Sequence, residues 1–309
     1  AKSRQGDKNS EGGCGMKPAA GTRVAFQGER GAFSEEAALK LLGPDINLVP
    51  CHTFEATFAA IHNGVADNVL VPMENSLAGS VHRSFDLLVT SRLHVVGEVI
   101  IAIAHNLIAL PGARFDELKS VESHSVALAQ CERFFQAHPE LKRIAAEDTA
   151  GSVREIMHAG DRSRAAIAGK HAAELYAARI LREHLEDDPE NYTRFFLLSA
   201  TPEPPLQIHS PRADKISLVF QLAHRPGALL RALEPFARRN INMMKIESRP
   251  MHGRAWQYRF YLDLQAAASE PEVLAALDEL RYAVVELKIL GAYKSACYQP
   301  AEIAQAEAV

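Results

Sequence analysis

The sequence is poor in the features that mark nucleic-acid-binding, metal-binding and membrane-spanning proteins. Its 34 Lys and Arg residues against 38 Asp and Glu residues give a formal net charge of −4, which indicates no basic surface for nucleic acid. The four cysteines form no Cys-x-x-Cys pair and no cluster with zinc-ligand spacing, so we expect reduced thiols and no metal site. No stretch approaches the ~20 apolar residues that span a bilayer, so no membrane partner is expected.

The N-terminal segment 1–21 is also without the apolar stretch of a secretory signal. It is polar and rich in Gly, Lys and Ser, which predicts a disordered tail. We expect residues 299–309 to form a second, fraying tail. A cytoplasmic location is the expectation that follows.

The length of 309 residues is too great for one typical core, so two or three compact units are expected. Strand and helix patterns alternate from residue 22, which predicts a largely parallel sheet with helices on both faces. A second such unit begins near residue 99. The expected strands cover 22–26, 48–50, 68–72, 99–103, 107–110, 120–122, 143–145, 165–167 and 195–198, and the expected helices 35–42, 53–63, 80–90, 126–138, 153–159 and 170–185. Two such lobes place a ligand between them.

The order of predicted strands and helices changes in the last third of the chain. Residues 200–213 contain four prolines and no periodicity, which predicts a stiff linker. The order that follows is βαββαβ, typical of a ferredoxin-like unit. Its strands are expected at 215–222, 241–248, 255–264 and 284–290, and its helices at 227–239 and 270–280.

Four polar loops follow predicted strands and precede helices, at residues 28–34, 74–79, 123–125 and 148–152. Helix N-termini present free N–H groups and a partial positive charge that attract carboxylates. Ser, Thr and Asp before a helix are usually caps, and we expect Ser34 to cap its helix. The pattern leaves both roles open.

The residue pattern of the segment Asn191-Tyr192-Thr193-Arg194-Phe195 does not by itself indicate a function. Four other motifs accompany it in the sequence. With Gly28 to Ser34, Pro72 to Ser76, Ser123-His124 and Asp148 to Ala150, in this order and spacing, it resembles the motif set of prephenate dehydratases. The resemblance covers about residues 22–298. Family members typically have Pro where this chain has Glu29; we expect little functional consequence in a turn.

The resemblance implies an α/β fold with two parts. A two-lobed catalytic body like a type II periplasmic binding protein would span residues 22–200, with its first lobe at about 22–100 and 192–200 and its second at about 101–191. A linker at 201–213 would lead to a ferredoxin-like βαββαβ ACT domain at 214–298.

The implied reaction is the decarboxylating dehydration of prephenate to phenylpyruvate in phenylalanine biosynthesis, without metal or cofactor. Thr193 would donate a hydrogen bond to the leaving hydroxyl, and Arg194 would orient the loop or neutralise a carboxylate. His124 is either an acid or a structural hydrogen bonder, and Glu74 fixes its loop or pairs with Arg194. The implied catalytic residues are Thr193, Arg194 and Phe195, and the implied substrate-binding residues are Gly28, Ala32, Phe33, Ser34, Glu74, Asn75, Ser76, Ser123, His124, Thr149, Ala150 and Ser152.

The final unit resembles ACT domains that respond to phenylalanine. Its motifs are Pro226 to Leu230 and Glu247 to Pro250, and Met244 stands where many relatives have a small hydroxyl residue. Such domains pair, so the resemblance implies a homodimer or homotetramer, through ACT and catalytic domains, inhibited by L-phenylalanine. The implied effector-binding residues are Gly227, Ala228, Leu229, Leu230, Asn240, Glu247, Ser248, Arg249 and Pro250.

Three other functions compete with this one. An arogenate or cyclohexadienyl dehydratase would use the same site. A non-enzymatic amino-acid sensor would have the same architecture, but the Thr193-Arg194-Phe195 triplet favours catalysis. A structural interaction module would leave five polar segments around one cleft without a purpose.

Overall fold

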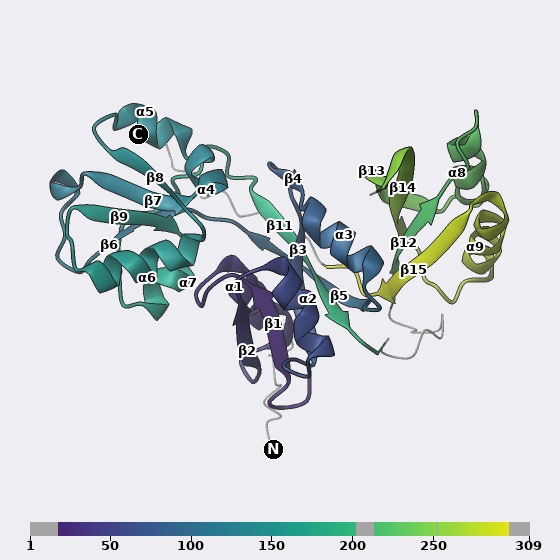
Figure 1. The fold of residues 1–309 in the computed structure, drawn as a ribbon, viewed down its shortest axis with the longest axis horizontal. Coiled ribbons are helices and arrows are strands. Elements are labelled where there is room, and N and C mark those ends of the chain that lie inside the picture. The colour runs from purple at the N-terminus through teal and green to yellow at the C-terminus, as the bar shows by residue number, and fades with distance from the viewer. Residues whose placement is uncertain (1–17, 202–212, 252, 297–309) are drawn as a thin grey trace, which may run out of the picture.

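The computed structural model describes residues 18–201, 213–251 and 253–296, and these form three β-sheets. Figure 1 shows them as three neighbouring bodies. We call the α/β body at its centre the first lobe, the one at its left the second lobe, and the one at its right the C-terminal unit; the two lobes together are the N-terminal body. The expected tails and linker lie almost wholly outside the described residues.

The first lobe combines six strands with three helices: β1 (Arg23–Gln27), α1 (Phe33–Leu42), β2 (Asn47–Cys51), α2 (Phe54–His62), β3 (Asn68–Asn75), β4 (Gly79–Ser80), α3 (His82–Thr90), β5 (His94–Ala102) and β11 (Tyr192–Ser199). The sheet order is β2-β1-β3-β11-β5, with β4 paired to β3. The predicted parallel pairing is confirmed for β1, β2 and β3. Strand β11 returns from the second lobe and runs antiparallel to β3 and β5.

The second lobe is a five-stranded sheet of order β10-β6-β9-β7-β8. Strands β7, β8 and β9 are parallel, while β6 runs against β9 and β10 against β6. The two-lobed arrangement predicted from the sequence is therefore confirmed. Its elements are β6 (Asn106–Ala109), a 3-10 turn (Phe115–Glu117), β7 (Ser120–His124), α4 (Ser125–Ala129), α5 (Glu132–Ala137), β8 (Lys142–Ala146), α6 (Thr149–Ala159), β9 (Arg164–Ala168), α7 (Lys170–Leu175) and β10 (Arg179–Arg182).

Two predicted helices of this lobe were wrong in extent. The helix predicted at 126–138 is split into α4 and α5, because the Asp187 carboxylate accepts the backbone N–H groups of Glu132 and Arg133 and so begins a new helix. The helix predicted at 170–185 ends at Leu175. Ala177 then takes a left-handed conformation (φ 52°), and the chain continues as the edge strand β10.

The predicted Ser34 cap was also wrong. Helix α1 begins at Phe33, two residues earlier than expected, and the residue before it is Ala32, which offers no side-chain cap. The carboxylate of Glu35 instead accepts the backbone N–H of Gly31 at 2.9 Å, so the helix start is tied to the loop that precedes it.

The C-terminal unit is the predicted βαββαβ arrangement, an antiparallel sheet of order β13-β14-β12-β15. Its elements are β12 (Lys215–Gln221), α8 (Ala228–Arg238), β13 (Asn242–Met251), β14 (Arg254–Gln265), α9 (Pro271–Ala283) and β15 (Glu286–Tyr293). Alternate residues of β12 and β14 pack under α8 and α9, which cover the outer face of the sheet in Figure 1.

The inner face of this sheet packs directly on the first lobe. Val219, Tyr261 and Leu290 belong to the same buried cluster as Phe85 and Leu88 of α3. Strand β15 approaches β5 so closely that a Cβ on Gly291 would lie 2.0 Å from the carbonyl oxygen of Val95. Only glycine fits there, so the two parts are joined by continuous core rather than by a loose contact.

Candidate functional site

A cavity of about 470 Å³ lies between the two lobes, and we call it the cleft. Both lobes contribute to it, and so does the segment between β5 and β6 that connects them, through His105. Of the residues proposed for the substrate site, those that line the cleft are Ala32, Phe33, Ser34, Asn75, His124, Thr149, Thr193 and Phe195. The carboxyl ends of β1, β3, β7 and β8 thus meet one space, as the two-lobed prediction requires.

Several expected site residues do not line the cleft. Ser123 is fully buried and donates to the carbonyl of Ile167, and Ser152 donates to that of Asp148. Ser76 donates to the carbonyl of Glu190 and Ala150 is buried in the second lobe. Gly28 lines a separate cavity of about 240 Å³ beside the cleft. These residues shape the loops of the site and do not face its centre.

Thr193 is held in a defined orientation by Asn75. The Asn75 carbonyl oxygen accepts the backbone N–H groups of Leu77 and Ala78, and its amide nitrogen donates to the carbonyl of Tyr192, so the amide cannot be reversed. The same nitrogen lies 3.0 Å from Thr193 Oγ1 and 2.7 Å from Asn191 Oδ1, so its two N–H groups are shared among three acceptors. The threonine hydroxyl therefore acts as acceptor toward the protein, and its own proton is free for a ligand in the cleft.

The orientation of Asn75 also sets three further side chains. Asn75 donates to Asn191 Oδ1 (2.7 Å), and Asn191 donates to Gln130 Oε1 (3.1 Å). Because that oxygen is an acceptor, His105 Nε2, 2.8 Å away, carries the proton. Burial lowers the pKa of His105, so the ring is neutral. This part of the cleft wall is thus a chain of hydrogen bonds between uncharged side chains, and Glu147 and Asp148 line the cleft from the second lobe.

His105 and Gln130 were missed by the sequence analysis, and Asn191 was quoted only as part of a motif. Their pairing joins residues 25 and 61 positions apart, and no periodicity signals it. Phe54 and Ile103 also line the wall and were missed for the same reason, whereas Pro72, which lies beside them, was quoted only as part of a motif.

Arg194, expected in the catalytic triplet, lies outside the cleft. Successive strand residues point to opposite faces, and on β11 Thr193 and Phe195 face the cleft while Arg194 faces the C-terminal unit. Its guanidinium contacts Asp263 (2.5 Å) and Glu74 (3.1 Å). Glu74 therefore pairs with Arg194, one of the two roles expected for it.

Around Arg194 lies a buried ionic cluster that joins the first lobe to the C-terminal unit. Lys215 bonds both oxygens of Glu98, at 3.0 and 2.8 Å, and Glu98 lies 3.6 Å from Arg194. Burial alone would raise the pKa of Asp263, but the charges of Arg194 and Lys215 hold it below its usual value. The cluster thus brings two basic side chains into contact with two carboxylates. We call Arg194, Glu98, Lys215 and Asp263 the junction cluster.

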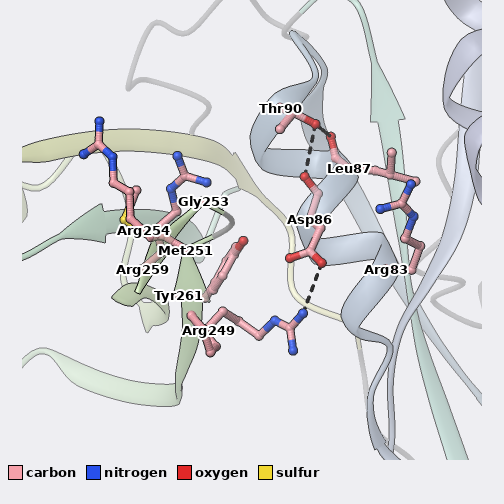
Figure 2. Close-up of a pocket in the computed structure, with 11 residues that line it drawn as sticks. Arg83, Asp86, Leu87, Thr90, Arg249, Met251, Gly253, Arg254, Arg259 and Tyr261 are labelled. Carbon is pink, nitrogen blue, oxygen red and sulfur yellow. Dashed lines mark hydrogen bonds and ion pairs between the residues drawn. The ribbon is translucent and has the colours of Figure 1, made fainter. Parts of the chain in front are cut away.

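The side chains of the expected effector motif on β13 alternate between the two faces of the sheet. Lys245 bonds Glu74 at 2.7 Å, and Glu247 is hydrogen-bonded to Ser80, a residue of the cleft wall. Arg249 reaches Asp86 of α3 at 3.1 Å, as Figure 2 shows. Ser248 and Pro250, between them, are exposed on the other face. Half of this motif thus contacts the N-terminal body.

The other expected effector residues lie around the two ends of α8. Gly227 precedes the helix with φ 73°, a left-handed conformation that favours glycine, and Ala228 and Leu229 begin its first turn beside it. Leu230 is 72% exposed. Asn240 follows the helix, also with positive φ (54°). These residues form a surface separate from the cleft.

Polar contacts cross the rim between the lobes. Glu29 lies 2.6 Å from Arg154 of α6, so the residue for which we expected little consequence ties the first lobe to the second. Glu35 is 3.3 Å from His171 of α7 and 2.9 Å from Arg30. Burial would raise the pKa of Glu35, but these two partners and the Gly31 N–H lower it to about 2.

No group of three or more His, Cys, Asp or Glu side chains in the described ranges is arranged to hold a metal ion. Among the same residues, no helix is both long and apolar enough to cross a bilayer. The cleft lining contains no Lys or Arg within the part of the chain that the structure describes.

Comparison with known proteins gives two matches to family models. The model described as "Prephenate dehydratase" matches residues 24–203, and the model described as "ACT domain" matches residues 216–282. Among curated proteins, arogenate dehydratase 2 of Petunia hybrida is 40% identical over 88% of this chain and 72% of its own length. Arogenate dehydratase/prephenate dehydratase 2 of Arabidopsis thaliana is 40% identical with the same coverage.

Two solved structures are similar over most of their length. Prephenate dehydratase from Arthrobacter aurescens in complex with L-Phe has a TM-score of 0.81 and 31% identity, covering 91% of this chain and 92% of its own. GqqA, described as a novel type of quorum quenching acylase, has a TM-score of 0.80 and 33% identity, covering 88% of this chain and 98% of its own.

Proposed function

Because the chain belongs to the prephenate dehydratase family and carries an ACT domain, it is a carbon–oxygen lyase, and we propose that its substrate is prephenate. The products are phenylpyruvate, carbon dioxide and water. The observation that carries the proposal is the Thr193 hydroxyl, which accepts from Asn75 and keeps its proton for a group in the cleft.

The chemistry requires help for the departing oxygen. The bond to the ring carboxylate breaks, its electron pair completes the aromatic ring, and the ring hydroxyl leaves as hydroxide. Hydroxide is a poor leaving group because water has a pKa of about 15.7. A hydrogen bond from Thr193 stabilises the charge that develops there, and positioned donors of this kind contribute ~10²–10⁴ in rate.

The rest of the cleft suits the changing ring. Phe33 and Phe195 supply apolar walls, and the neutral amide chain from Asn75 to His105 supplies dipoles without fixed charge. Since carbon dioxide is released and an aromatic ring forms, the reaction has its own thermodynamic drive. We therefore assign no cofactor role to any described residue.

The decisive experiment mixes purified protein with prephenate and follows phenylpyruvate. Thr193→Ala should lower kcat by about 10²-fold with little change in KM, because the lost interaction forms only as the hydroxyl departs. Thr193→Ser keeps the hydroxyl and is the matched control. A kcat for Thr193→Ala equal to that of the unaltered protein would remove Thr193 from the mechanism.

Arogenate is the second candidate substrate, because both curated relatives are named for it. It differs from prephenate in carrying an ammonium in place of a keto group. The ratio of kcat/KM for the two compounds, measured side by side, assigns the preference.

The similarity to an acylase is not matched by the chemistry around Thr193. Amide hydrolysis by a hydroxyl nucleophile needs an adjacent base to take its proton. Thr193 Oγ1 is bonded to the amide of Asn75, which is a donor. Dehydration, which needs a donor at this position, fits better.

We further propose that L-phenylalanine binds the C-terminal unit of a homodimer or homotetramer and inhibits turnover. Exposed apolar side chains on this unit, Leu230, Met244, Ile246 and Trp256, support pairing of two copies there. The bond from Glu247 to Ser80 supports a route from that unit to the cleft. Equal turnover with and without saturating phenylalanine would contradict the inhibition, and light scattering tests the assembly.

A further inference from the structure

A second, larger cavity lies outside the cleft, between α3 of the first lobe and the hairpin formed by β13 and β14 (Figure 2). Its volume is about 830 Å³, against about 470 Å³ for the cleft. We call it the arginine groove. Two of the expected effector residues, Arg249 and Pro250, line it, whereas the residues proposed for the reaction do not.

The groove contains more positive charge than its own acidic residues can neutralise. Arg83, Arg249, Arg254 and Arg259 line it, together with one carboxylate, Asp86. Two of the four arginines are neutralised: Arg83 pairs with Glu55 of α2, and Arg249 pairs with Asp86. The side chains of Arg254 and Arg259 have no ion pair or hydrogen bond with any residue that the structure describes. Two positive charges thus remain uncompensated.

A second observation points the same way. The Nε–H of Arg249 is buried and has no acceptor among the described residues. A buried donor without an acceptor is costly, and native proteins seldom keep one unless a ligand or water completes it. Burial lowers the pKa of Lys288 on β15, and the charge of Arg259 acts in the same direction. The positive field of the groove therefore extends beyond its lining.

The residues that line the groove indicate which kind of ligand it can bind. Leu87 of α3 and Met251 of β13 line it beside the charged groups, and the ring of Tyr261 lies behind them. Apolar walls between guanidinium groups suit a carbon skeleton with anionic ends. Guanidinium groups bind carboxylates through paired N–H donors, one group for each carboxylate.

We propose that the arginine groove is a binding site for a small dicarboxylate, held by Arg254 and Arg259 beside the Arg249–Asp86 pair. The site is distinct from the cleft. Because its walls belong to α3 on one side and to the C-terminal unit on the other, its occupant contacts both parts of the chain at once.

The test is calorimetric titration of the full-length protein with succinate at constant ionic strength, with chloride replacing succinate in the reference. We expect saturable binding. Arg254→Gln and Arg259→Gln should each weaken it about tenfold, the effect of removing one charge-assisted hydrogen-bonded partner. Arg83→Gln is the matched control, since Glu55 already neutralises Arg83, and it should change the dissociation constant by less than about twofold.

Turnover of the proposed substrate, measured without succinate, should be the same in all three variants, which shows that they are folded. An increase in the unfolding temperature of the unaltered protein with succinate is an independent readout. Absence of binding overturns the proposal. Binding that survives both Arg254→Gln and Arg259→Gln places succinate elsewhere and also overturns it, and binding of inorganic phosphate but not succinate overturns the dicarboxylate assignment.

Discussion

The cleft and the junction with the C-terminal unit are both buried and polar, but they handle charge in opposite ways. The part of the cleft wall that runs from Asn75 to His105 is a chain of neutral amides and one neutral imidazole, while Glu147 and Asp148 line the cleft from the second lobe. The junction cluster, only one residue away along β11, consists of four charged groups. Neutral donors hold an anionic ligand without binding it irreversibly, whereas buried ion pairs tolerate little rearrangement. We infer that the first region is built for exchange and the second for a fixed geometry.

The largest effect is expected from breaking the junction cluster. Asp263→Ala leaves Arg194 and Lys215 short of one buried counter-charge, and removing one partner of a buried pair costs about 3–5 kcal/mol. Chemical denaturation should therefore show a large loss in the free energy of unfolding. The matched control is Asp67→Ala, which breaks the exposed Arg23–Asp67 pair and should cost less than about 1 kcal/mol. Equal losses in the two variants would contradict the contrast.

A smaller effect is expected from placing a charge in the neutral wall. Gln130→Glu adds a carboxylate within hydrogen-bond distance of His105 and Asn191, where it repels an anionic substrate. We expect kcat/KM to fall at least about tenfold near pH 8, a repulsion of roughly 1.4 kcal/mol or more. The loss should diminish as the pH falls, because the introduced carboxylate and His105 then take up a proton between them.

The matched control for that substitution is Gln136→Glu on α5, an exposed position outside the cleft lining. Its kcat/KM should stay within about twofold of the unaltered value. A pH-independent loss in Gln130→Glu would mean that the substitution acts through structure and not through charge.

The smallest effect concerns the rim between the lobes, which is neither neutral nor fully buried. The hydrogen bond to Glu35 raises the pKa of His171, so the pair stabilises the fold at pH values below the unfolded pKa of about 6.5 and is lost as the pH rises through the raised folded value. We expect His171→Gln to cost about 1 kcal/mol or less at pH 6 and nothing above that range. Thermal unfolding from pH 5.5 to 9 measures it; an unchanged pH profile would contradict it.

Comparing the predicted and observed positions of individual residues shows what the sequence can predict. Thr193, Asn75 and Phe33 were placed correctly in the cleft because ordered motifs follow strands that end at one edge. Arg194 was assigned to the same site, although strand alternation turns it to the opposite face. Alternation along a regular strand could have indicated this, since successive side chains in mid-strand point to opposite faces.

Other features were beyond sequence reasoning. The pairing of His105 with Gln130 depends on how two connecting segments pack, and residue patterns carry no trace of it. The strand β10 lies in an Ala-rich stretch with helical composition, and its edge pairing with β6 overrode that local preference. The cytoplasmic location expected from the N-terminal residues remains a prediction.

The alternation along β11 has a consequence for dissection of the chain. A fragment ending after residue 201 would keep Thr193 and its neighbours in the cleft, but it would strip Arg194 of Asp263 and expose Phe196 and Val95 to water. Such a fragment would expose a new apolar surface, and Arg194 would keep only Glu74 and Glu98 as partners, on the same strand as the Thr193 hydroxyl. We therefore expect a chain cut at residue 201 to be less stable and more prone to aggregate than the full-length protein.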